Sequence, residues 1–307
     1  LSLPESGTKA MPELPEVETV RRGLAPVFVG ARIQRLQQNR ADLRFPLPDH
    51  FPQRLEGQRV EALDRRAKYL LMHLEQGEIL LIHLGMSGRF LIDQPQGKGA
   101  KSQQPGSFYH HTDSGRAHEH VVFYTDQGVR IGYVDPRRFG FMRLIAADAF
   151  ENEPLLRDLG VEPLSNQFDA EALRQALAGC RAPLKTALLD QKRIAGLGNI
   201  YVCEALHRAG LSPWRAAGTL ALASASSRRR AETLTHCIRQ VLQDAVAAGG
   251  SSLKDFAAAD GSLGYFQHRF RVYDQAGQAC PTPSCQGRVE RQVQAGRSTF
   301  YCARCQK

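Results

Sequence analysis

The sequence predicts an α+β protein of several domains, in which a helix leads into a β-sandwich or barrel, followed by a helical region and a zinc hairpin. Three observations predict this class. Short segments with strand character recur between residues 32 and 145, the pattern becomes helical after about residue 151, and four cysteines gather between residues 280 and 305. A chain of 307 residues is long enough for two or three domains with a substantial buried core.

The first predicted element is an amphipathic helix over residues 15–28. Val17, Val20, Leu24 and Val27 share one face of this helix. Strands follow where short apolar segments are separated by Gly, Asp and Pro, at 32–37, 60–63, 69–74, 79–84, 89–92, 121–124, 129–133 and 141–145. A long mobile loop, rich in Gln, Gly, Ser and His, is expected over residues 94–118.

Four helices are predicted after residue 151, at 170–178, 184–191, 200–208 and 220–248. A glycine-rich turn over residues 194–201 opens the third of them. Backbone amides at such a helix start bind phosphate well, but a plain corner between two helices explains the same residues. The sequence leaves both interpretations open.

The C-terminal cysteines indicate a zinc ribbon, with short-spaced pairs at two turns of a β-hairpin. A reducing cytosol argues against disulfides, and four thiolates fill a tetrahedral site, so the zinc is expected to be structural. The metal ligands are Cys280, Cys285, Cys302 and Cys305. The remaining cysteines lie singly in helical sequence and are expected to be small buried apolar residues: Cys180, Cys203 and Cys237.

The charge of the chain favours nucleic acid as its partner. Net charge is +9, yet only 23% of residues are charged and 42% are apolar, which is typical of a folded protein with a basic surface. Residues 265–307 hold seven Lys and Arg against Asp274 and Glu290, so the zinc hairpin is expected to grip DNA. No stretch approaches the ~18 apolar residues of a membrane span, and residues 1–10 contain no secretory signal, so a cytoplasmic location without membrane attachment is expected.

The run MPELPEVET at residues 11–19 is the most informative segment. If Met11 is the true start and is removed, Pro12 carries a secondary amine directly beside the Glu13 carboxylate. A terminal amine is nucleophilic once it is unprotonated, because its reference pKa is only about 7.7–8.0. The alternative is a proline-rich helix start, in which Glu16 and Glu18 complement the helix dipole.

Six motifs together resemble bacterial formamidopyrimidine-DNA glycosylases, in order from Met11 to Lys307. They are PELPEVET at 12–19, RRAKYL at 65–70, HLGMSG at 83–88, DPRRFG at 135–140, GNIY at 198–201 and the cysteine hairpin. The resemblance implies an N-terminal β-sandwich that carries the catalytic helix (12–148), a helix-two-turn-helix DNA-binding domain (149–264) and a zinc finger (265–307). It also implies one structural zinc as the only cofactor and a monomer that binds double-stranded DNA.

The resemblance further implies base-excision repair of oxidised purines, chiefly 8-oxoguanine and formamidopyrimidines, followed by β,δ-elimination at the abasic sugar. Pro12 would be the Schiff-base nucleophile and Glu13 the general acid that helps to open the sugar ring. Lys68 would donate a proton in β-elimination, and Arg297 would bind phosphate and assist δ-elimination. Without the resemblance, Glu13 would favour the helix dipole, while Lys68 and Arg297 would be ordinary solvated cations.

Further roles follow from the same resemblance. A glycosylase rotates its target out of the duplex and compensates the lost stacking, and the matching void-filling residues are Met86, Arg137 and Phe139. The phosphate contacts implied are His118, Arg137, Arg181, Lys185 and Asn199. Residues 249–256 resemble the loop that closes over an everted oxidised purine, with Ser251, Ser252 and Lys254 as its polar members.

Two departures and two rival functions accompany this interpretation. Four residues separate Cys280 from Cys285, where the family usually has two, and residues 1–11 are expected to be an extension or misassigned start that is absent from the active form. One rival is the endonuclease VIII type, which removes oxidised pyrimidines; Leu14 and the 249–256 loop argue against it. The other is a non-enzymatic zinc-containing DNA-binding protein that has lost the nucleophile.

Overall fold

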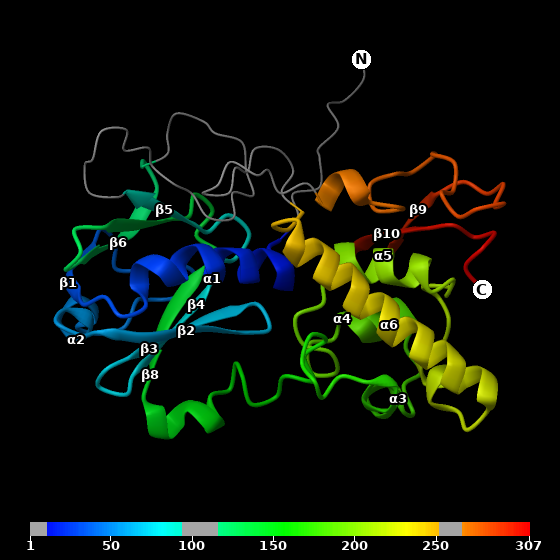
Figure 1. The fold of residues 1–307 in the computed structure, drawn as a ribbon, viewed down its shortest axis with the longest axis horizontal. Helices are drawn as coiled ribbons and strands as arrows, with labels where there is room; N and C mark the ends of the chain where they lie inside the picture. Colours follow the sequence, from blue (N-terminus) through cyan, green and yellow to red (C-terminus); the bar gives the residue numbers. More distant parts are fainter. Residues whose placement is uncertain (1–10, 94–115, 252–265) are drawn as a thin grey trace, which may run out of the picture.

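The computed structural model describes residues 11–93, 116–251 and 266–307. Figure 1 shows three parts in chain order: two β-sheets with helix α1, a group of helices, and a C-terminal hairpin beside those helices. The expected α+β architecture is confirmed. Most of the predicted loop 94–118, together with Ser252 and Lys254, lies outside the described residues.

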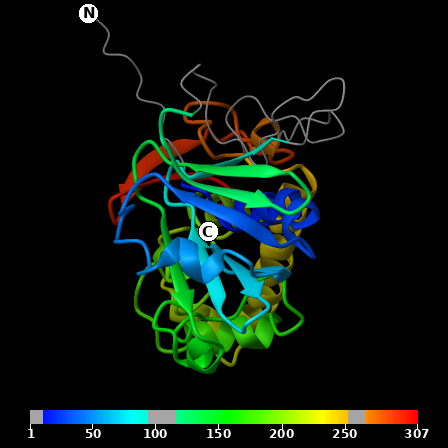
Figure 2. The same ribbon diagram turned by 90° about the vertical axis from the view of Figure 1, so that its left-hand side faces the viewer.

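Helix α1 spans Leu14–Phe28, with Pro15 in its first turn, where a missing N–H costs nothing. Its apolar face is buried in a core that both sheets share, including the predicted Val17, Val20 and Leu24. Figure 1 shows the sheets above and below α1, and Figure 2 shows them as stacked layers. The helix is thereby fixed along its length, and its N-terminus points toward the helical part of the chain.

The β-region forms a sandwich rather than a closed barrel, because its described strands pair into two separate antiparallel sheets. In one sheet the order is β1 (Ile33–Gln38), β6 (Glu119–Thr125), β7 (Arg130–Val134) and β5 (Arg89–Asp93). In the other it is β2 (Val60–Arg66), β3 (Tyr69–Leu74), β4 (Ile79–His83) and β8 (Phe141–Ile145).

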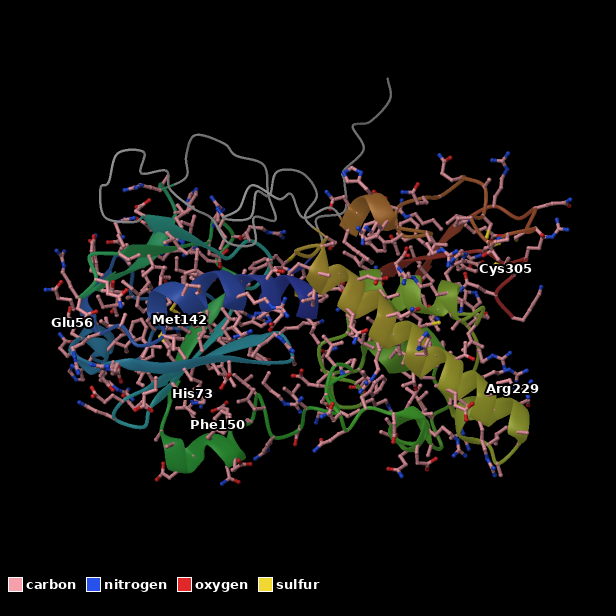
Figure 3. The ribbon with its side chains drawn as sticks, in the orientation of Figure 1. Glu56, His73, Met142, Phe150, Arg229 and Cys305 are labelled. Carbon is pink, nitrogen blue, oxygen red and sulfur yellow. The ribbon has the colours of Figure 1, made fainter. Side chains whose placement is uncertain are left out.

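Two further contributions complete the core of the sandwich. Met142 of β8, labelled in Figure 3, is buried in the same core as the apolar face of α1. A short helix that the sequence analysis did not predict, α2 (Phe51–Leu55), adds Phe51 and Leu55 to it. Helix α1 is therefore held by side chains from strands and helix alike.

The helical part contains α3 (Ala170–Leu177), α4 (Leu184–Leu189), α5 (Asn199–Arg208) and α6 (Ala225–Ala247). The last helix begins later than residue 220, because Ala217–Ala221 forms a separate 3-10 turn. The Ser224 side chain then accepts the Ser227 N–H at 3.2 Å, which caps the new helix start. Gly249 and Gly250 end the helix in left-handed conformations.

The C-terminal part begins with a 3-10 turn, Phe266–Arg269, and ends in a hairpin of β9 (Glu290–Gln294) and β10 (Arg297–Tyr301). Ala295 and Gly296 both have positive φ angles, as a tight two-residue hairpin turn requires. Phe300 and Tyr273 join the hydrophobic core of the helical part, so the hairpin is packed directly against α5.

A search of the described helices found none that combines the length and the apolar character needed to cross a membrane.

Candidate active site

Glu13 stands where the first turns of two helices meet. It is the N-cap of α1 and only 4% exposed, and its Oε1 atom accepts the Ile200 N–H of α5 at 3.1 Å. Unpaired amides and the helix dipole make a helix N-terminus attractive to anions. The glycine-rich turn therefore binds a carboxyl group of the protein itself.

The glycines of this turn permit the close approach of the two helices. Gly196 has a φ of +90°, its carbonyl accepts the Leu14 N–H at 3.3 Å, and a Cβ there would lie 2.7 Å from Leu14 Cδ1. A Cβ at Gly198 would overlap the Glu13 carboxylate. A larger residue at either position would displace the side chain of Leu14 or Glu13 from its present place.

Burial raises the pKa of Glu13 to about 7. The nearby Lys68 cation opposes this rise, while the Glu16 carboxylate adds to it. Glu13 Oε2 is buried and has no hydrogen-bond partner in the described part of the chain. A carboxyl group that keeps its proton near neutral pH, with one oxygen free, is suited to donate that proton.

Glu16 joins three separate parts of the molecule. Its Oε2 atom accepts the Glu13 N–H at 2.9 Å, which satisfies one of the free amides at the start of α1. Its Oε1 atom accepts the Ser251 N–H at 2.7 Å and hydroxyl at 2.8 Å, and also the Tyr201 hydroxyl. The buried Glu16 carboxylate thus connects α1, α5 and the start of the predicted lesion-capping loop.

Lys68 is brought into the same site. Its side chain is only 7% exposed, and burial lowers the pKa of its ammonium group. The Glu13 carboxylate opposes that shift, whereas the Arg297 cation adds to it. The structure therefore gathers the predicted catalytic residues Glu13, Lys68 and Arg297 within one electrostatic environment, next to Pro12.

A turn held from the second domain directs Lys68 inward. Ala67 has a φ of +52°, a left-handed conformation that is unfavourable for a residue with a Cβ. Its N–H donates to the carboxylate of Glu162, and its carbonyl accepts from Arg65 Nη1 at 2.9 Å. Arg65 Nη1 also pairs with Glu162 Oε2 at 3.0 Å, which closes the network.

Arg297 is exposed at the start of β10, and its neighbours are anchored to the helices. The Ser298 carbonyl accepts from both Lys185 Nζ and Asn199 Nδ2 at 3.0 Å, and Lys185 also reaches Thr299 Oγ1 at 2.7 Å. Lys185 is only 1% exposed, so its ammonium faces the hairpin rather than solvent. In the structure, both Lys185 and Asn199 hydrogen-bond to the hairpin. A phosphate contact by either residue stays a prediction.

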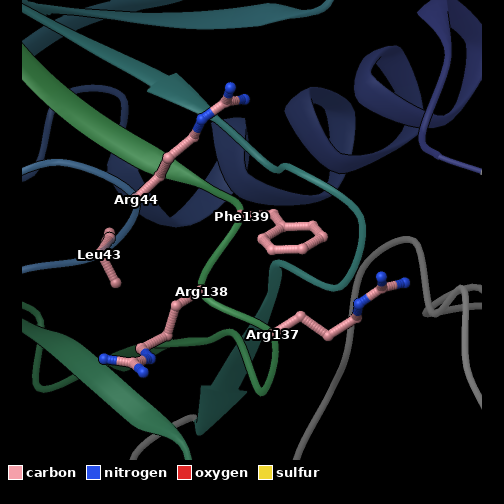
Figure 4. Close-up of a pocket in the computed structure, with 5 residues that line it drawn as sticks. All are labelled: Leu43, Arg44, Arg137, Arg138 and Phe139. Atoms are coloured by element: carbon pink, nitrogen blue, oxygen red, sulfur yellow. The ribbon is translucent and has the colours of Figure 1, made fainter.

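Two of the three predicted void-filling residues, Arg137 and Phe139, line the hollow shown in Figure 4, and Met86 is not among its lining residues. Arg137 and Phe139 are both exposed, and the Arg137 guanidinium carbon lies 4.7 Å from the centre of the Phe139 ring. The hollow has a volume of about 480 Å³. Its lining is strongly basic and consists of Leu43, Arg44, Arg137, Arg138 and Phe139.

A buried carboxylate ties this turn to the loop that carries Met86. Asp135, with no exposed surface, accepts from the Ser87 hydroxyl through Oδ1 and from the Gly140 N–H at 2.8 Å through Oδ2. Ser87 Oγ in turn accepts the Arg137 N–H at 3.1 Å. Met86, Arg137 and Phe139 are thus presented on one rigid support rather than on two independent loops.

The other predicted contact residues lie at the edges of the site. His118 is exposed just before β6, and its carbonyl accepts the Asp135 N–H at 3.0 Å. Arg181 is exposed just before α4. Ser251 is buried against Glu16.

The sequence analysis assigned no role to His83, although it lies in the HLGMSG motif. Its Nδ1 atom accepts the Gly85 N–H at 3.0 Å, and its ring stacks on Phe141 with the centroids 5.3 Å apart. Burial, helped by the cations Lys68 and Arg44, lowers the pKa of His83 to about 4. The ring is therefore neutral at pH 7. The place of His83 directly before the Leu84-Gly85 turn was the sequence feature that could have indicated its contact with the turn. The contacts of Glu16 with Tyr201 and Ser251, and the role of Glu162, were not predicted because the partners are distant in sequence.

The four C-terminal cysteines converge as predicted, with their sulfur atoms all within 4.8 Å of one another. The Cys280–Cys305 and Cys285–Cys302 sulfur pairs are each 3.7 Å apart. Tetrahedral ligation with Zn–S bonds of about 2.3 Å places sulfurs about 3.8 Å apart, so the set fits zinc. The four-residue spacing between Cys280 and Cys285 does not prevent this geometry.

Comparison with known protein families gives three matches in chain order. Residues 11–142 match the formamidopyrimidine-DNA glycosylase N-terminal domain, and residues 159–257 match the helix-two-turn-helix domain of the same glycosylases. Residues 277–307 match a zinc finger found in this glycosylase and in isoleucyl-tRNA synthetase.

Individual relatives match over almost the whole chain. The formamidopyrimidine-DNA glycosylase of Beijerinckia indica is 59% identical over 97% of this chain and its own full length. That of Caulobacter sp. strain K31 is 57% identical over 96% of this chain and its full length. Among solved structures, the Lactococcus lactis enzyme with abasic-site DNA has a TM-score of 0.78 and 30% identity, covering 96% of this chain and 100% of that one. The Thermus thermophilus enzyme has a TM-score of 0.75 and 38% identity, covering 96% and 98%.

Replacing Glu13 by glutamine should change how stability depends on pH. The folded protein keeps the Glu13 proton up to about pH 7, whereas the unfolded chain loses it near 4.5. The folded wild type therefore binds more protons in this window, and its free energy of unfolding should fall as pH rises through it. A glutamine side chain cannot titrate. The free energy of unfolding of Glu13→Gln, relative to that of the wild type, should therefore be higher at pH 7 than at pH 5 by on the order of 1–3 kcal/mol.

Urea unfolding at pH 5 and pH 7 measures this difference, and Glu61→Gln, at an exposed position of β2, is the matched control. The free energy of unfolding of the control should change between the two pH values as much as that of the wild type. An equal stability difference between Glu13→Gln and wild type at both pH values would contradict the prediction.

Proposed function

The chain belongs to the formamidopyrimidine-DNA glycosylase family, and from this premise we propose that it excises oxidised purines from double-stranded DNA and cleaves the resulting abasic strand. The observation that carries the proposal is the protonatable, buried carboxyl of Glu13 beside Lys68, next to Pro12 at the start of α1. This arrangement supplies an acid and a cation at the position where an N-terminal amine would act.

Pro12 supplies the nucleophile in a chain that begins at this residue. Its amine attacks C1′ of the damaged nucleotide, the bond between sugar and base breaks, and the base leaves as the new C–N bond forms. The amine gives up its proton as this bond forms, and the departing base takes up a proton. The bond between C1′ and the ring oxygen then breaks as that oxygen is protonated, which leaves an iminium ion whose nitrogen has no further proton to lose and so cannot become a neutral imine. Its charge acidifies C2′, so loss of a C2′ proton expels the 3′ phosphate and a second elimination expels the 5′ phosphate.

Glu13 and Lys68 move the protons that these steps require. The free Oε2 of Glu13 donates its proton to the sugar-ring oxygen as the ring opens. Lys68 is the proton donor in β-elimination, and burial lowers the pKa of its ammonium, which eases that transfer. Exposed Arg297 binds the phosphate that departs.

The basic hollow beside Phe139 receives the strand opposite the lesion. Extrusion of a nucleotide costs a few kcal/mol of stacking and pairing, and inserted side chains recover part of that cost. Arg137 faces the orphaned base while Phe139 and Met86 support the stack. The exposed cations around the hollow attract the phosphate backbone.

Oxidised purine is the proposed lesion because the sequence of residues 249–256 resembles the loop that closes over an everted oxidised purine in this family. Within this stretch, Ser251 is anchored on Glu16. Solved structures of the Lactococcus lactis protein include one with formamidopyrimidine-containing DNA and one with oxidised-pyrimidine DNA. Binding alone therefore does not separate the two specificities, and the rates of excision from duplexes that carry each lesion distinguish the proposed enzyme from an endonuclease VIII type enzyme.

The zinc finger is proposed to hold one structural zinc ion through its four thiolates, which leave no coordination position for water. When bound, the metal supplies folding energy to the hairpin and no chemistry to the reaction. The active species is proposed to be a monomer that works on cytoplasmic DNA.

Cys302→Ser should release zinc and weaken DNA binding, because metal binding stabilises the fold of this small hairpin. Atomic absorption of the purified protein measures the zinc, and fluorescence anisotropy with a lesion duplex measures the affinity. Cys180→Ser, outside the cluster, should leave both unchanged. Full zinc content with unchanged affinity in Cys302→Ser would rule out the structural site.

Arg137→Ala should reduce excision from a lesion duplex by more than about tenfold, while stability changes by less than ~0.5 kcal/mol, as is usual for an exposed truncation. Single-turnover cleavage and thermal unfolding measure the two effects. Arg157→Ala, a truncation of another exposed arginine, is the control and should affect neither. Normal activity per folded molecule together with a large loss of stability would make Arg137 a structural residue.

A chain that begins at Pro12 should form a covalent adduct with 8-oxoguanine DNA under borohydride, whereas the chain that begins at Leu1 should bind the duplex without reacting. The reason is that an amide nitrogen is delocalised into its carbonyl and is not nucleophilic. Intact mass must confirm each N-terminus before the trapping experiment.

Equal trapping of an unprocessed Leu1 chain would show that Pro12 is not the nucleophile and would direct attention to Lys68. Absence of any adduct in either form, with intact DNA binding, would favour the non-enzymatic rival.

A further inference from the structure

We propose that His207 is a positioning residue of the zinc site, which donates a hydrogen bond from Nε2 to the Cys280 thiolate and so helps to retain the metal. His207 belongs to α5 of the helical part, and its Nε2 atom lies 3.4 Å from Cys280 Sγ. The side chain is only 3% exposed. This inference rests on the proposed zinc, which the closing experiment tests separately.

The surroundings of the imidazole fix which nitrogen carries the proton. A zinc-bound thiolate accepts hydrogen bonds but cannot donate one, so Nε2 must be the protonated nitrogen. Thr282 Oγ1 lies 3.3 Å from the same nitrogen and 3.8 Å from Cys305 Sγ, so its hydroxyl can serve a second thiolate. His207 Nδ1 has no hydrogen-bond partner in the described part of the chain. The polar contacts of the ring there are therefore those of Nε2 with Cys280 and Thr282.

His207 does not complete the metal's coordination itself. The four sulfur atoms already form the compact set, and His207 is not among the residues whose ligand atoms all lie within 4.8 Å of one another. Four thiolates around Zn²⁺ carry a net charge of −2, which is costly in a partly buried site unless donors offset it. The Gly287 N–H, 3.4 Å from Cys285 Sγ, is one such donor, and His207 supplies another to buried Cys280.

A second contact on the same face of α5 supports this docking role. Glu204, three residues before His207 and fully buried, accepts the N–H groups of Arg271, Val272 and Tyr273 at 2.9–3.1 Å. Residues three apart share a helix face, so Glu204 and His207 together fasten the zinc segment to α5. The opposite end of α5 donates hydrogen bonds to Glu13 and Ser298. The same helix therefore links the cysteine cluster to the candidate active site.

The test measures how fast full-length, zinc-loaded protein loses metal to excess chelator. His207→Phe keeps an aromatic ring but removes the donor, and it should lose zinc about ten to a hundred times faster, the usual effect of deleting a group that supports a ligand. His207→Gln retains an N–H donor and should stay closer to the wild type. His236→Phe, the same change at an exposed position on α6, is the matched control and should release zinc at the wild-type rate.

Cobalt substitution provides a readout independent of stability. If His207 only donates to sulfur, the wild type and His207→Phe should both show the charge-transfer absorption of four thiolates. Spectra that indicate a nitrogen ligand in the wild type, or equal zinc release from the wild type and His207→Phe, would overturn the proposal. If His207→Phe does not fold, His207→Met takes its place in the comparison with His207→Gln. Equal rates of zinc release from His207→Met and His207→Gln would also overturn the proposal. A wild type that binds no zinc would instead refute the metal site itself.

Discussion

Burial of the Glu13 carboxylate against the first turn of α5 is the contact on which the rest of the active site depends. It places a carboxyl group between two helix N-termini, where solvent is excluded and free amides stabilise negative charge. Exclusion of solvent raises the pKa of Glu13 and the amides lower it, and burial has the larger effect because the pKa rises overall. The same contact depends on Gly196 and Gly198, because a Cβ at either position would overlap the side chain of Leu14 or Glu13.

The helical domain then supports residues of the N-terminal domain. Glu162 holds the left-handed turn before Lys68, and Ser251 and Tyr201 hold Glu16. Unfavourable features, such as the positive φ of Ala67 and the buried carboxylates, persist because partners from another domain stabilise them. A substitution in the helical domain can therefore alter the surroundings of Glu13 and Lys68 from outside the N-terminal domain.

Local patterns predicted most of the fold. Alternating apolar residues gave the strands of both sheets within a few residues, because a buried face imposes a period of two. The start of α6 was wrong because the apolar residues before Ser224 belong to a separate turn, and the Ser224 cap was not weighed against them. Helix α2 was missed because five residues show too little periodicity. Of the site, motif resemblance named Glu13, Lys68 and the cysteines. It could not reveal Glu16, Glu162 or the burial of Lys185, whose partners lie tens to hundreds of residues away.

The long sequence separation of these contacts has a consequence for synthesis. Glu13 and Ile200 are 187 residues apart, and Glu16 and Ser251 are 235 apart. At roughly 5–20 residues per second, a ribosome needs on the order of ten seconds or more to add the second member of each pair. During that interval the sandwich can fold, while α1 presents its carboxylates to water without the amides that later cover them. The nascent chain therefore exposes the acidic first turn of α1 long before its partners exist, and the buried arrangement of Glu13 and Glu16 forms only after residue 251 has been translated.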